Sequence, residues 1–329
     1  MPTCSPVSRR LVLSGLAAAL LPASALAADD VWPSRPVTMI VPFAAGGSTD
    51  VIGRVVAEGL RQELGQPVLV DNRGGAGGTI GTAAIVKAQP DGYTIGMGTA
   101  STLAINPAAY KSLGYDVLTG LIPVSNIAAV PNIMTINPAV PATDMKSFVA
   151  LAKAQPGKLS YASAGIGSVS HLMGEQLKLA TGTDIVHVPY RGIGPALNDA
   201  VGGQVQVLFD NLPSSLPMVQ AGKLRALAVS GPSRVAALPD VPTFTELGLD
   251  DLGWMAFFGI VVPEKTPAAV VSKLHAATVK ALGHEEVKSR LVAQQAVIVG
   301  NTPAEFAAEI RRDLDRMKRA VAAAKIELN

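Results

Sequence analysis

The stretch VTMIVPFAAGGSTDVIGRVVAEGL, residues 37–60, sets the fold class. Its first seven residues are mostly apolar or β-branched and end at a turn of small residues, which predicts a buried strand. Apolar residues then recur at helical spacing, at Val51, Ile52, Val55, Val56 and Leu60. Asp50 or Ser48 is placed to cap the first turn of this helix. Because a glycine-rich turn that opens a helix offers free backbone N–H groups, the stretch predicts a strand, an anion-binding turn and a helix.

Two more strands follow with short connections. PVLVDN (67–72) and YTIGMG (93–98) are predicted strands, with a second glycine turn, GGAGG (74–78), and a helix over 79–88 between them. The polar segment TASTLAINP (99–107) is expected to be a loop. This alternation predicts a parallel, doubly wound sheet whose ligands bind at the carboxyl ends of the strands. The GGAGG glycines are expected to shape a turn and to allow close helix packing rather than to touch a ligand.

The middle third repeats the plan. Strands are predicted at KLSYASAG, DIVHVPYRG, VQVLFDN and LRALAVSG, and helices at SVSHLMGEQLKLA, GPALNDAVGG and SSLPMVQAG. The last third has one predicted strand, WMAFFGIVVP (254–263), and is otherwise helical. These helices need a sheet to pack on, so the chain is expected to return to the first unit.

The predicted fold is therefore two doubly wound α/β lobes with a ligand cleft between them. Two crossover strands, near 124–135 and 254–262, connect the lobes. The expected boundaries are 28–128 plus 254–329 for lobe 1 and 129–253 for lobe 2. A cleft between two such lobes is a common place for a small ligand.

The first residues have the pattern of an export signal. Two arginines precede an apolar stretch (11–21) that is too short to span a bilayer, and small residues follow at 25–27. The pattern predicts a cleaved signal peptide, residues 1–27, and a periplasmic location. SRRLVL resembles a twin-arginine signal, and the general secretory route is also open. Cys4 leaves with the signal, so the mature chain has no cysteine and no disulfide.

The mature chain is electrically neutral. The full chain has 27 Lys and Arg against 25 Asp and Glu, and removal of two arginines leaves 25 of each (27 − 2 = 25). A neutral chain has no electrostatic reason to bind nucleic acid or an anionic membrane. No later apolar run reaches the length of a membrane span, so the mature protein is expected to be free in the periplasm.

Catalytic and cofactor motifs are absent or incomplete. There is no phosphate-binding P-loop, GIGSVS (165–170) lacks the third glycine of the dinucleotide fingerprint, and the four histidines lack zinc-site spacing, so no cofactor and no metal are expected. The GGSTD turn resembles a nucleophile elbow but lacks its last glycine. A periplasmic serine hydrolase, using Ser48 or Ser168 with His171 or His187, is one alternative function.

Several longer segments resemble one family in order from Trp32 to about Pro267. They are WPSRPVTMIVPFAAGGSTDVIGR, VDNRGGAGGTIGTAAIVKAQPDGYTI, TLAINPAAYKSLGYD, SAGIGSVSHLMGE, VPYRGIGPALNDAVGGQV and ALPDVPTFTELG. The sequence resembles the Bug family, the periplasmic solute-binding receptors of tripartite tricarboxylate transporters. It departs from the usual family pattern at Ala45, Gly114 and Arg191, which leaves the identity of the ligand open.

The resemblance implies a type II periplasmic-binding fold in which two α/β lobes close on a small carboxylate. The implied ligand is a dicarboxylate or tricarboxylate, an acidic amino acid or an aromatic acid. It implies no catalysis and no cofactor, and a monomer is expected. The implied partners are the membrane subunits of the transporter, or alternatively a sensor receptor domain to which the bound solute is presented.

The resemblance also implies a set of ligand contacts. Backbone N–H groups at helix starts and hydroxyls hold a carboxylate without a buried counter-charge, whose desolvation is costly. In lobe 1 the candidates are Phe43, Ala44, Ala45, Gly46, Gly47, Ser48, Thr99, Ser101 and Thr102. In lobe 2 they are Ser163, Ala164, Gly165, Gly167, Ser168, His171, Tyr190, Arg191, Gly192 and Asp210.

Three of these residues have two open interpretations each. His171 either hydrogen-bonds the ligand or packs within the lobe. Arg191 either pairs with a second carboxylate or is a solvated residue at the rim. Asp210 either accepts a hydrogen bond from a ligand amine or from the closing loop, or has a helix-capping or hinge role.

Overall fold

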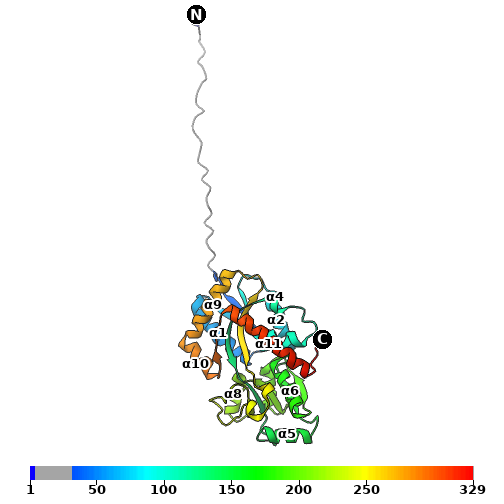
Figure 1. Cartoon of the computed structure of the whole chain (residues 1–329). Helices are drawn as coiled ribbons and strands as arrows, with labels where there is room; N and C mark the ends of the chain where they lie inside the picture. The colour runs from blue at the N-terminus through cyan, green and yellow to red at the C-terminus, as the bar shows by residue number, and fades with distance from the viewer. Residues whose placement is uncertain (4–31, 329) are drawn as a thin grey trace. The chain divides into compact units, whose positions relative to one another are not determined.

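The computed structural model describes residues 1–3 and 32–328 (Figure 1). The predicted signal peptide lies outside the described residues except for its first three, and so do the twin-arginine pattern and Cys4. From Trp32 onward the chain forms one compact unit that contains two β-sheets. None of the helices in the described part of the chain has the length and apolar character needed to cross a membrane.

The first sheet has six strands. They are β1 (Val37–Val41), β2 (Val68–Asn72), β3 (Thr94–Thr99), β4 (Leu121–Val130), β10 (Ala256–Pro263) and β11 (Val297–Ile298). Their order in the sheet is β11-β4-β10-β3-β1-β2. The strands β1, β2 and β3 are parallel, as the first third of the sequence predicts. In contrast, β10 enters from the other sheet and runs antiparallel to both β3 and β4.

The second sheet has five strands. They are β5 (Asn132–Ile136), β6 (Ser160–Ser163), β7 (Val186–Pro189), β8 (Val207–Asn211) and β9 (Arg225–Val229), in the order β7-β6-β8-β5-β9. Strand β6 is parallel to β7 and β8, whereas β5 is antiparallel to β8 and β9. Both sheets are mixed. Their parallel neighbours are joined by crossover connections, whereas β4, β5 and β10 adjoin the two connections between the sheets and run antiparallel to their neighbours.

Two connections join the sheets. Strand β4 continues through Pro131 directly into β5, and the segment 230–255 returns the chain from β9 to β10. The second connection is tied by Gly231 N–H, which donates to Gly253 O at 3.0 Å. The two-lobe α/β fold predicted from the sequence is confirmed by this architecture.

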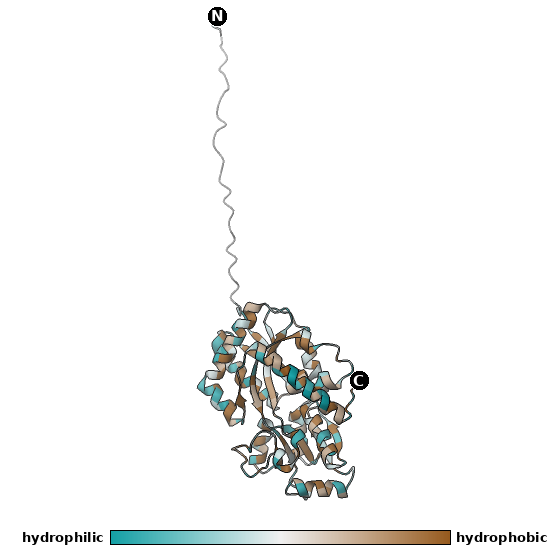
Figure 2. Ribbon diagram, viewed as in Figure 1, coloured by the Kyte–Doolittle hydropathy of each residue, from teal (hydrophilic) through white to brown (hydrophobic). Residues whose placement is uncertain are grey.

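Amphipathic helices cover both sheets. Helix α1 (Ser48–Leu64) buries Ile52, Val56 and Leu60, and ends at Gly65 in the left-handed conformation that favours glycine. Figure 2 shows apolar strands inside the fold and helices with one apolar and one polar side. The remaining α-helices are α2 (Thr79–Val86), α3 (Asn106–Ala109), α4 (Val117–Gly120), α5 (Met145–Ala154), α6 (Val169–Thr181), α7 (Ile193–Val201), α8 (Leu212–Gln220), α9 (Ala268–Gly283), α10 (Glu285–Ala293) and α11 (Pro303–Ala323).

The segment TASTLAINP is not the loop that its polarity predicts. Residues Ser101–Ile105 form a short π-helix, η2, which leads directly into α3. Thr102 Oγ1 accepts from Thr99 N–H at 3.0 Å and so closes the turn at the end of β3. The buried side chains of Leu103 and Ile105 supply the apolar face that a solvated loop lacks.

The start of α1 also differs from the expected capping. Its N-cap is Gly47, and neither Ser48 nor Asp50 occupies that position. The Asp50 carboxylate instead accepts from Gly46 N–H at 3.0 Å and pairs with Arg54 at 2.9 Å. The Ser48 side chain is thereby left free for contacts outside its own helix.

Three short 3₁₀ helices complete the described structure. They are η1 (Ala76–Gly78), η3 (Thr245–Leu247) and η4 (Asp250–Leu252). The first, η1, lies in the GGAGG turn, whose Gly77 has φ +60° and Gly78 φ +95°. Glycine is required at both positions because other residues rarely adopt these angles.

Candidate functional site

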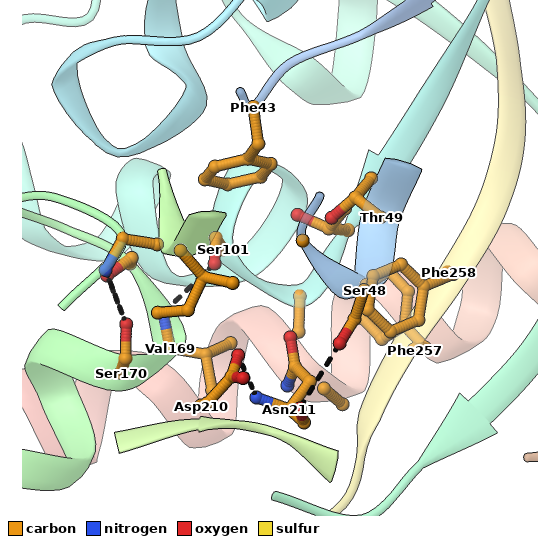
Figure 3. A pocket seen from close by; sticks show the side chains of 17 residues that line it. Phe43, Ser48, Thr49, Ser101, Val169, Ser170, Asp210, Asn211, Phe257 and Phe258 are labelled. Carbon is orange, nitrogen blue, oxygen red and sulfur yellow. Dashed lines mark hydrogen bonds between the residues drawn. The ribbon is translucent and has the colours of Figure 1, made fainter. Parts of the chain in front are cut away.

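Four helices begin where strands of the two sheets end, and their first residues meet at one cavity. Helix α1 follows β1, while α6, α7 and α8 follow β6, β7 and β8. Figure 3 shows side chains from both sheets pointing into this space. The cavity volume is about 30 Å³, room for one or two water molecules. It is lined by Phe43, Gly47, Ser48, Thr49, Thr99, Ala100, Ser101, Ala164, Ser168, Val169, Ser170, Ile193, Asp210, Asn211, Ala256, Phe257 and Phe258.

The cavity presents hydrogen-bond donors but no cationic side chain. Its lining contains serine and threonine hydroxyls and the first residues of several helices, and no Lys, Arg or His. The N-terminus of a helix carries a partial positive charge and unpaired N–H groups, so it attracts an anion. The aromatic rings of Phe43, Phe257 and Phe258 supply apolar walls. The arrangement therefore suits a small anion with an apolar body.

Ser48 reaches from α1 to the start of α8. Its hydroxyl lies 2.8 Å from Ser214 Oγ and 3.2 Å from Asn211 O, and it accepts from Ser214 N–H at 3.1 Å. Residue 48 belongs to a helix of the six-stranded sheet, and residues 211 and 214 belong to the five-stranded one. This group of hydrogen bonds therefore joins the two halves of the fold directly.

Asp210 is the one ionisable side chain that lines the cavity. Its carboxylate accepts from Ser214 Oγ at 2.5 Å, from Ser215 Oγ at 2.6 Å and from Asn211 N–H at 2.6 Å. Burial raises its pKa to about 7, and the three hydrogen bonds, which favour the charged form, offset only part of that effect. Since Ser214 also contacts Ser48, the carboxylate is linked to the opposite half of the fold through one side chain.

A second contact of the same kind lies at the start of α6. Val169 N–H donates to Ser101 Oγ at 2.9 Å, across from η2. Two serine hydroxyls of lobe 1 therefore each contact the first turn of a lobe 2 helix. Ser48 contacts α8, and Ser101 contacts α6. Both sites are buried, so these bonds form away from bulk water.

Glycines allow the backbones of the two halves to approach closely around the cavity. A Cβ added at Gly77 would lie well under 3.0 Å from Ile166 O, and one at Gly74 would lie 2.6 Å from Arg191 O. A Cβ at Gly192 would lie 2.8 Å from Ala44 N. These glycines form what we call the glycine seam, and Gly74 and Gly77 belong to the GGAGG turn. Their role between the sheets goes beyond the local turn and helix packing expected from the sequence.

The cavity contains part of the residue set expected from the sequence. The expected residues that line it are Phe43, Gly47, Ser48, Thr99, Ser101, Ala164, Ser168 and Asp210. The other expected residues lie outside this lining. Thr102 is in η2, Ser163 in β6 and His171 in α6, and the loops after the strands hold Ala44, Ala45, Gly46, Gly165, Gly167, Tyr190, Arg191 and Gly192. The lining residues that sequence reasoning missed are Thr49, Ala100, Val169, Ser170, Ile193, Asn211, Ala256, Phe257 and Phe258.

Signals for some of the missed residues were present in the sequence. Thr49 and Asn211 directly follow residues that were selected, and Ile193 follows Gly192 at a helix start. Phe257 and Phe258 had no local signal, because they reach the cavity through the pairing of β10 with β3. In that register Phe258 lies opposite Thr99.

Two of the four histidines, His171 and His187, form a stacked group outside the cavity lining. His171 and His187 stack at 4.3 Å between ring centroids, and His187 stacks on Tyr161 at 4.8 Å. His171 Nδ1 accepts from Gly167 N–H at 3.2 Å, and His187 Nε2 lies 2.6 Å from Ser163 Oγ. Burial lowers the pKa of His171, and burial together with nearby His171 lowers that of His187 to about 3. Both rings are therefore neutral packing groups at neutral pH.

This geometry does not assemble a serine hydrolase. Ser168 Oγ donates to Gly165 O at 2.6 Å, and Ser48 Oγ contacts only residues of α8 and its N-cap. Neither hydroxyl hydrogen-bonds to an imidazole among the described residues. The Ser163 hydroxyl, which does, is fully buried. No group of three potential metal ligands occurs in the described part of the chain either.

Tyr190 and Arg191 lie in the loop between β7 and α7 and do not line the cavity. The Tyr190 hydroxyl donates to Asp199 at 2.7 Å, and burial followed by this carboxylate raises its pKa to about 12. Arg191 is exposed, and its side chain forms no ion pair with any described residue. Its backbone carbonyl faces Gly74 in the glycine seam.

Residues 52–325 match the family described as tripartite tricarboxylate transporter family receptor. The chain belongs to this receptor family. The tripartite tricarboxylate transporter receptors include BugT of Bordetella pertussis, which is 38% identical over 311 residues, covering 94% of this chain and 95% of BugT. The resemblance to the Bug family is thereby confirmed.

Solved structures agree with this assignment. The periplasmic binding protein BugD superposes with a TM-score of 0.88 at 36% identity, covering 91% of this chain and all of BugD. MatC from Rhodopseudomonas palustris with bound malate superposes with a TM-score of 0.85 at 32% identity, covering 88% of this chain and all of MatC. These receptors are solute-binding proteins and not enzymes, and so is this member of the family.

Proposed function

We propose that this receptor closes its two lobes, 28–128 plus 254–329 and 129–253, on a small carboxylate. The observation that carries the proposal is the convergence of helix starts and hydroxyls on one cavity without a cationic side chain. Such a site compensates one negative charge by partial charges and hydrogen bonds, as a carboxylate requires. MatC, which holds malate, has the same fold and supports this ligand class.

Within this proposal the lining residues of the cavity contact the two ends of the ligand separately. The starts of α1 and α6, with Ser101, face the carboxylate, while Asp210 and the start of α8 face the other end of the ligand. Binding favours the closed form because the ligand contacts both lobes only when they meet.

We further propose that residues 1–27 direct export and are removed, and that the receptor delivers its ligand to the membrane subunits of a tripartite tricarboxylate transporter. The family assignment supports a role beside a transporter. Uptake of the labelled ligand in a strain lacking this receptor tests the delivery step. Unchanged uptake, with altered transcription of transport genes, would assign the receptor to signalling instead.

A thermal-shift screen tests the ligand class. The panel contains tricarboxylates, four-carbon dicarboxylates, acidic amino acids and aromatic acids, with neutral sugars and amides as controls. A ligand that binds only the folded state at 100 times its Kd adds about 2.7 kcal/mol of stability, which raises Tm by several degrees. A shift from a neutral solute, with none from any carboxylate, would contradict the proposal.

A further inference from the structure

A second and larger cavity lies away from the cleft. Its volume is about 450 Å³, within the range of small-molecule sites, and it shares no lining residue with the first cavity. Its walls come from α6, which packs on the five-stranded sheet, and from α11, which packs on the six-stranded sheet. The lining residues are Gln176, Leu179, Ala180, Asp250, Asp251, Trp254, Arg316, Met317, Arg319, Ala320 and Ala323.

Three of the residues lining this second cavity carry buried polar atoms that have no hydrogen-bond partner. They are Gln176 Oε1, Trp254 Nε1 and Arg316 Nε. Gln176 is 7% exposed and Trp254 is 9% exposed. A buried donor or acceptor without a partner is costly, and three around one cavity are unusual in a folded protein. Gln176 Oε1 is an acceptor, whereas Trp254 Nε1 and Arg316 Nε are donors.

Arg316 covers the tryptophan. Its guanidinium carbon lies 5.4 Å from the centroid of the Trp254 ring, and its side chain is 40% exposed. The same guanidinium pairs with Asp313 at 3.0 Å. A molecule that reaches the Trp254 indole from this side must therefore displace Arg316 from both contacts.

Uncommitted charges of both signs surround the same opening. Arg319 forms no ion pair with any described residue, and neither do Asp250 and Asp251 on the opposite wall. Leu179, which is 59% exposed, and Met317 supply apolar surface between them. The site thus offers donors and a cation on one side, and an acceptor and anions on the other.

We propose that this cavity is a second binding site, and that it takes a small zwitterion such as an α-amino acid or a betaine. The carboxylate end receives hydrogen bonds from Trp254 Nε1, Arg316 Nε and Arg319. The ammonium end faces Gln176 Oε1 and the Asp250–Asp251 pair. The apolar part of the ligand lies against Leu179 and Met317. With an α-amino acid, whose ammonium group donates hydrogen bonds, this pairing satisfies all three unpartnered atoms. A betaine, which has no N–H, supplies only its positive charge at the Gln176 and Asp250–Asp251 end.

The tryptophans provide a site-specific measurement. The chain has two, Trp32 and Trp254, so a Trp32→Phe variant leaves Trp254 as the single indole reporter. Neither tryptophan lines the cavity in the cleft. L-alanine, L-leucine and glycine betaine are titrated while Trp254 emission is followed. Acetate and methylammonium, which each carry one end of the zwitterion, serve as probes of each half. We expect a saturable change with the zwitterions and at least tenfold weaker effects with the half ligands.

Variants locate the binding. Arg319→Met removes an exposed cation without touching the core, and Gln176→Leu removes the unpartnered acceptor; each should weaken binding at least tenfold in the Trp32→Phe background. Arg312→Met, on the same helix but outside the cavity lining, is the matched control and should bind as before. No saturable change with any zwitterion, or a change that survives both cavity variants, would overturn the proposal. Neither result bears on the carboxylate screen, which reports on the cleft.

Discussion

Ser48 Oγ and Ser214 Oγ lie 2.8 Å apart, one on each side of the cleft. Ser48 is at the first residue of α1, and Ser214 is in the first turn of α8. A hydrogen bond between them exists only while the two halves of the fold are in contact. The pair therefore contributes to the free energy of closure and, through closure, to the affinity for the ligand.

Ser48→Ala should weaken ligand binding. The substitution removes hydrogen bonds to Ser214 and Asn211, and one net hydrogen bond contributes about 1 kcal/mol. We expect the Kd for the best carboxylate to rise roughly fivefold, measured by isothermal titration calorimetry. Ser112→Ala, an exposed residue away from the cavity, should leave Kd unchanged. Equal Kd values for both variants would show that this contact does not contribute to closure.

Gly77→Ala should block closure. Gly77 has φ +60°, and an added Cβ would collide with Ile166 O of the other lobe. Gly65→Ala is a matched control, because Gly65 has φ +67° with no atom within 4 Å of an added Cβ. Each variant should lose about 1–2 kcal/mol of unfolding free energy from backbone strain.

The two glycine variants should differ in closure and in ligand binding, and not in unfolding free energy. We expect Gly77→Ala to lose at least tenfold in affinity and to stay more extended in small-angle X-ray scattering with ligand present. Gly65→Ala should close and bind like the unmodified protein. Similar affinity for the two variants would rule out the glycine seam as a requirement for closure.

Asp210→Asn should change how stability depends on pH. Burial raises the Asp210 pKa from 3.8 to about 7 in the folded protein. Between those values the folded state holds a proton that the unfolded state has released, so this residue's contribution to stability falls as pH rises from about 4 to 7. The unmodified protein should therefore lose stability relative to the Asp210→Asn variant across that range, measured by urea unfolding at pH 5 to 8. A constant difference between the two would contradict the raised pKa.

Arg191→Gln should have little effect on ligand affinity. The side chain is exposed, does not line the cavity and forms no ion pair with a described residue. A solvated charge outside the cavity lining is screened by salt, so we expect Kd to change less than about twofold. Ser101→Ala, which removes the acceptor for Val169 N–H, should raise Kd more in the same assay. A large loss on Arg191→Gln would instead support pairing with a second carboxylate.

The strands and helices of residues 37–99 were predictable because their signals are local. Each apolar run is bounded by a glycine turn, and each helix repeats its apolar residues over consecutive turns. The same logic identified loops at the carboxyl ends of strands, and Ser48, Ser101 and Asp210 lie on the cavity as a result. The sequence contained no comparable signal for the π-helix at Ser101–Ile105, whose regular backbone depends on buried contacts of Leu103 and Ile105.

Contacts between the halves were not predictable in this way. Phe257 reaches the cavity because β10 inserts between β3 and β4, which depends on strand pairing over a long sequence separation. Gly77 faces Ile166 only once both lobes are assembled. A glycine that serves a local turn and one that serves a distant backbone look the same in a sequence. Pairing partners, rather than residue types, were the missing information.

The cavity of about 30 Å³ has room for one or two water molecules, and a dicarboxylate is larger. The walls that the two lobes contribute must therefore move outward around a bound ligand. A longer carboxylate would move them farther still. The angle between the lobes would then record the length of the cargo, and a membrane partner that docks across both lobes would receive a differently shaped surface for each solute.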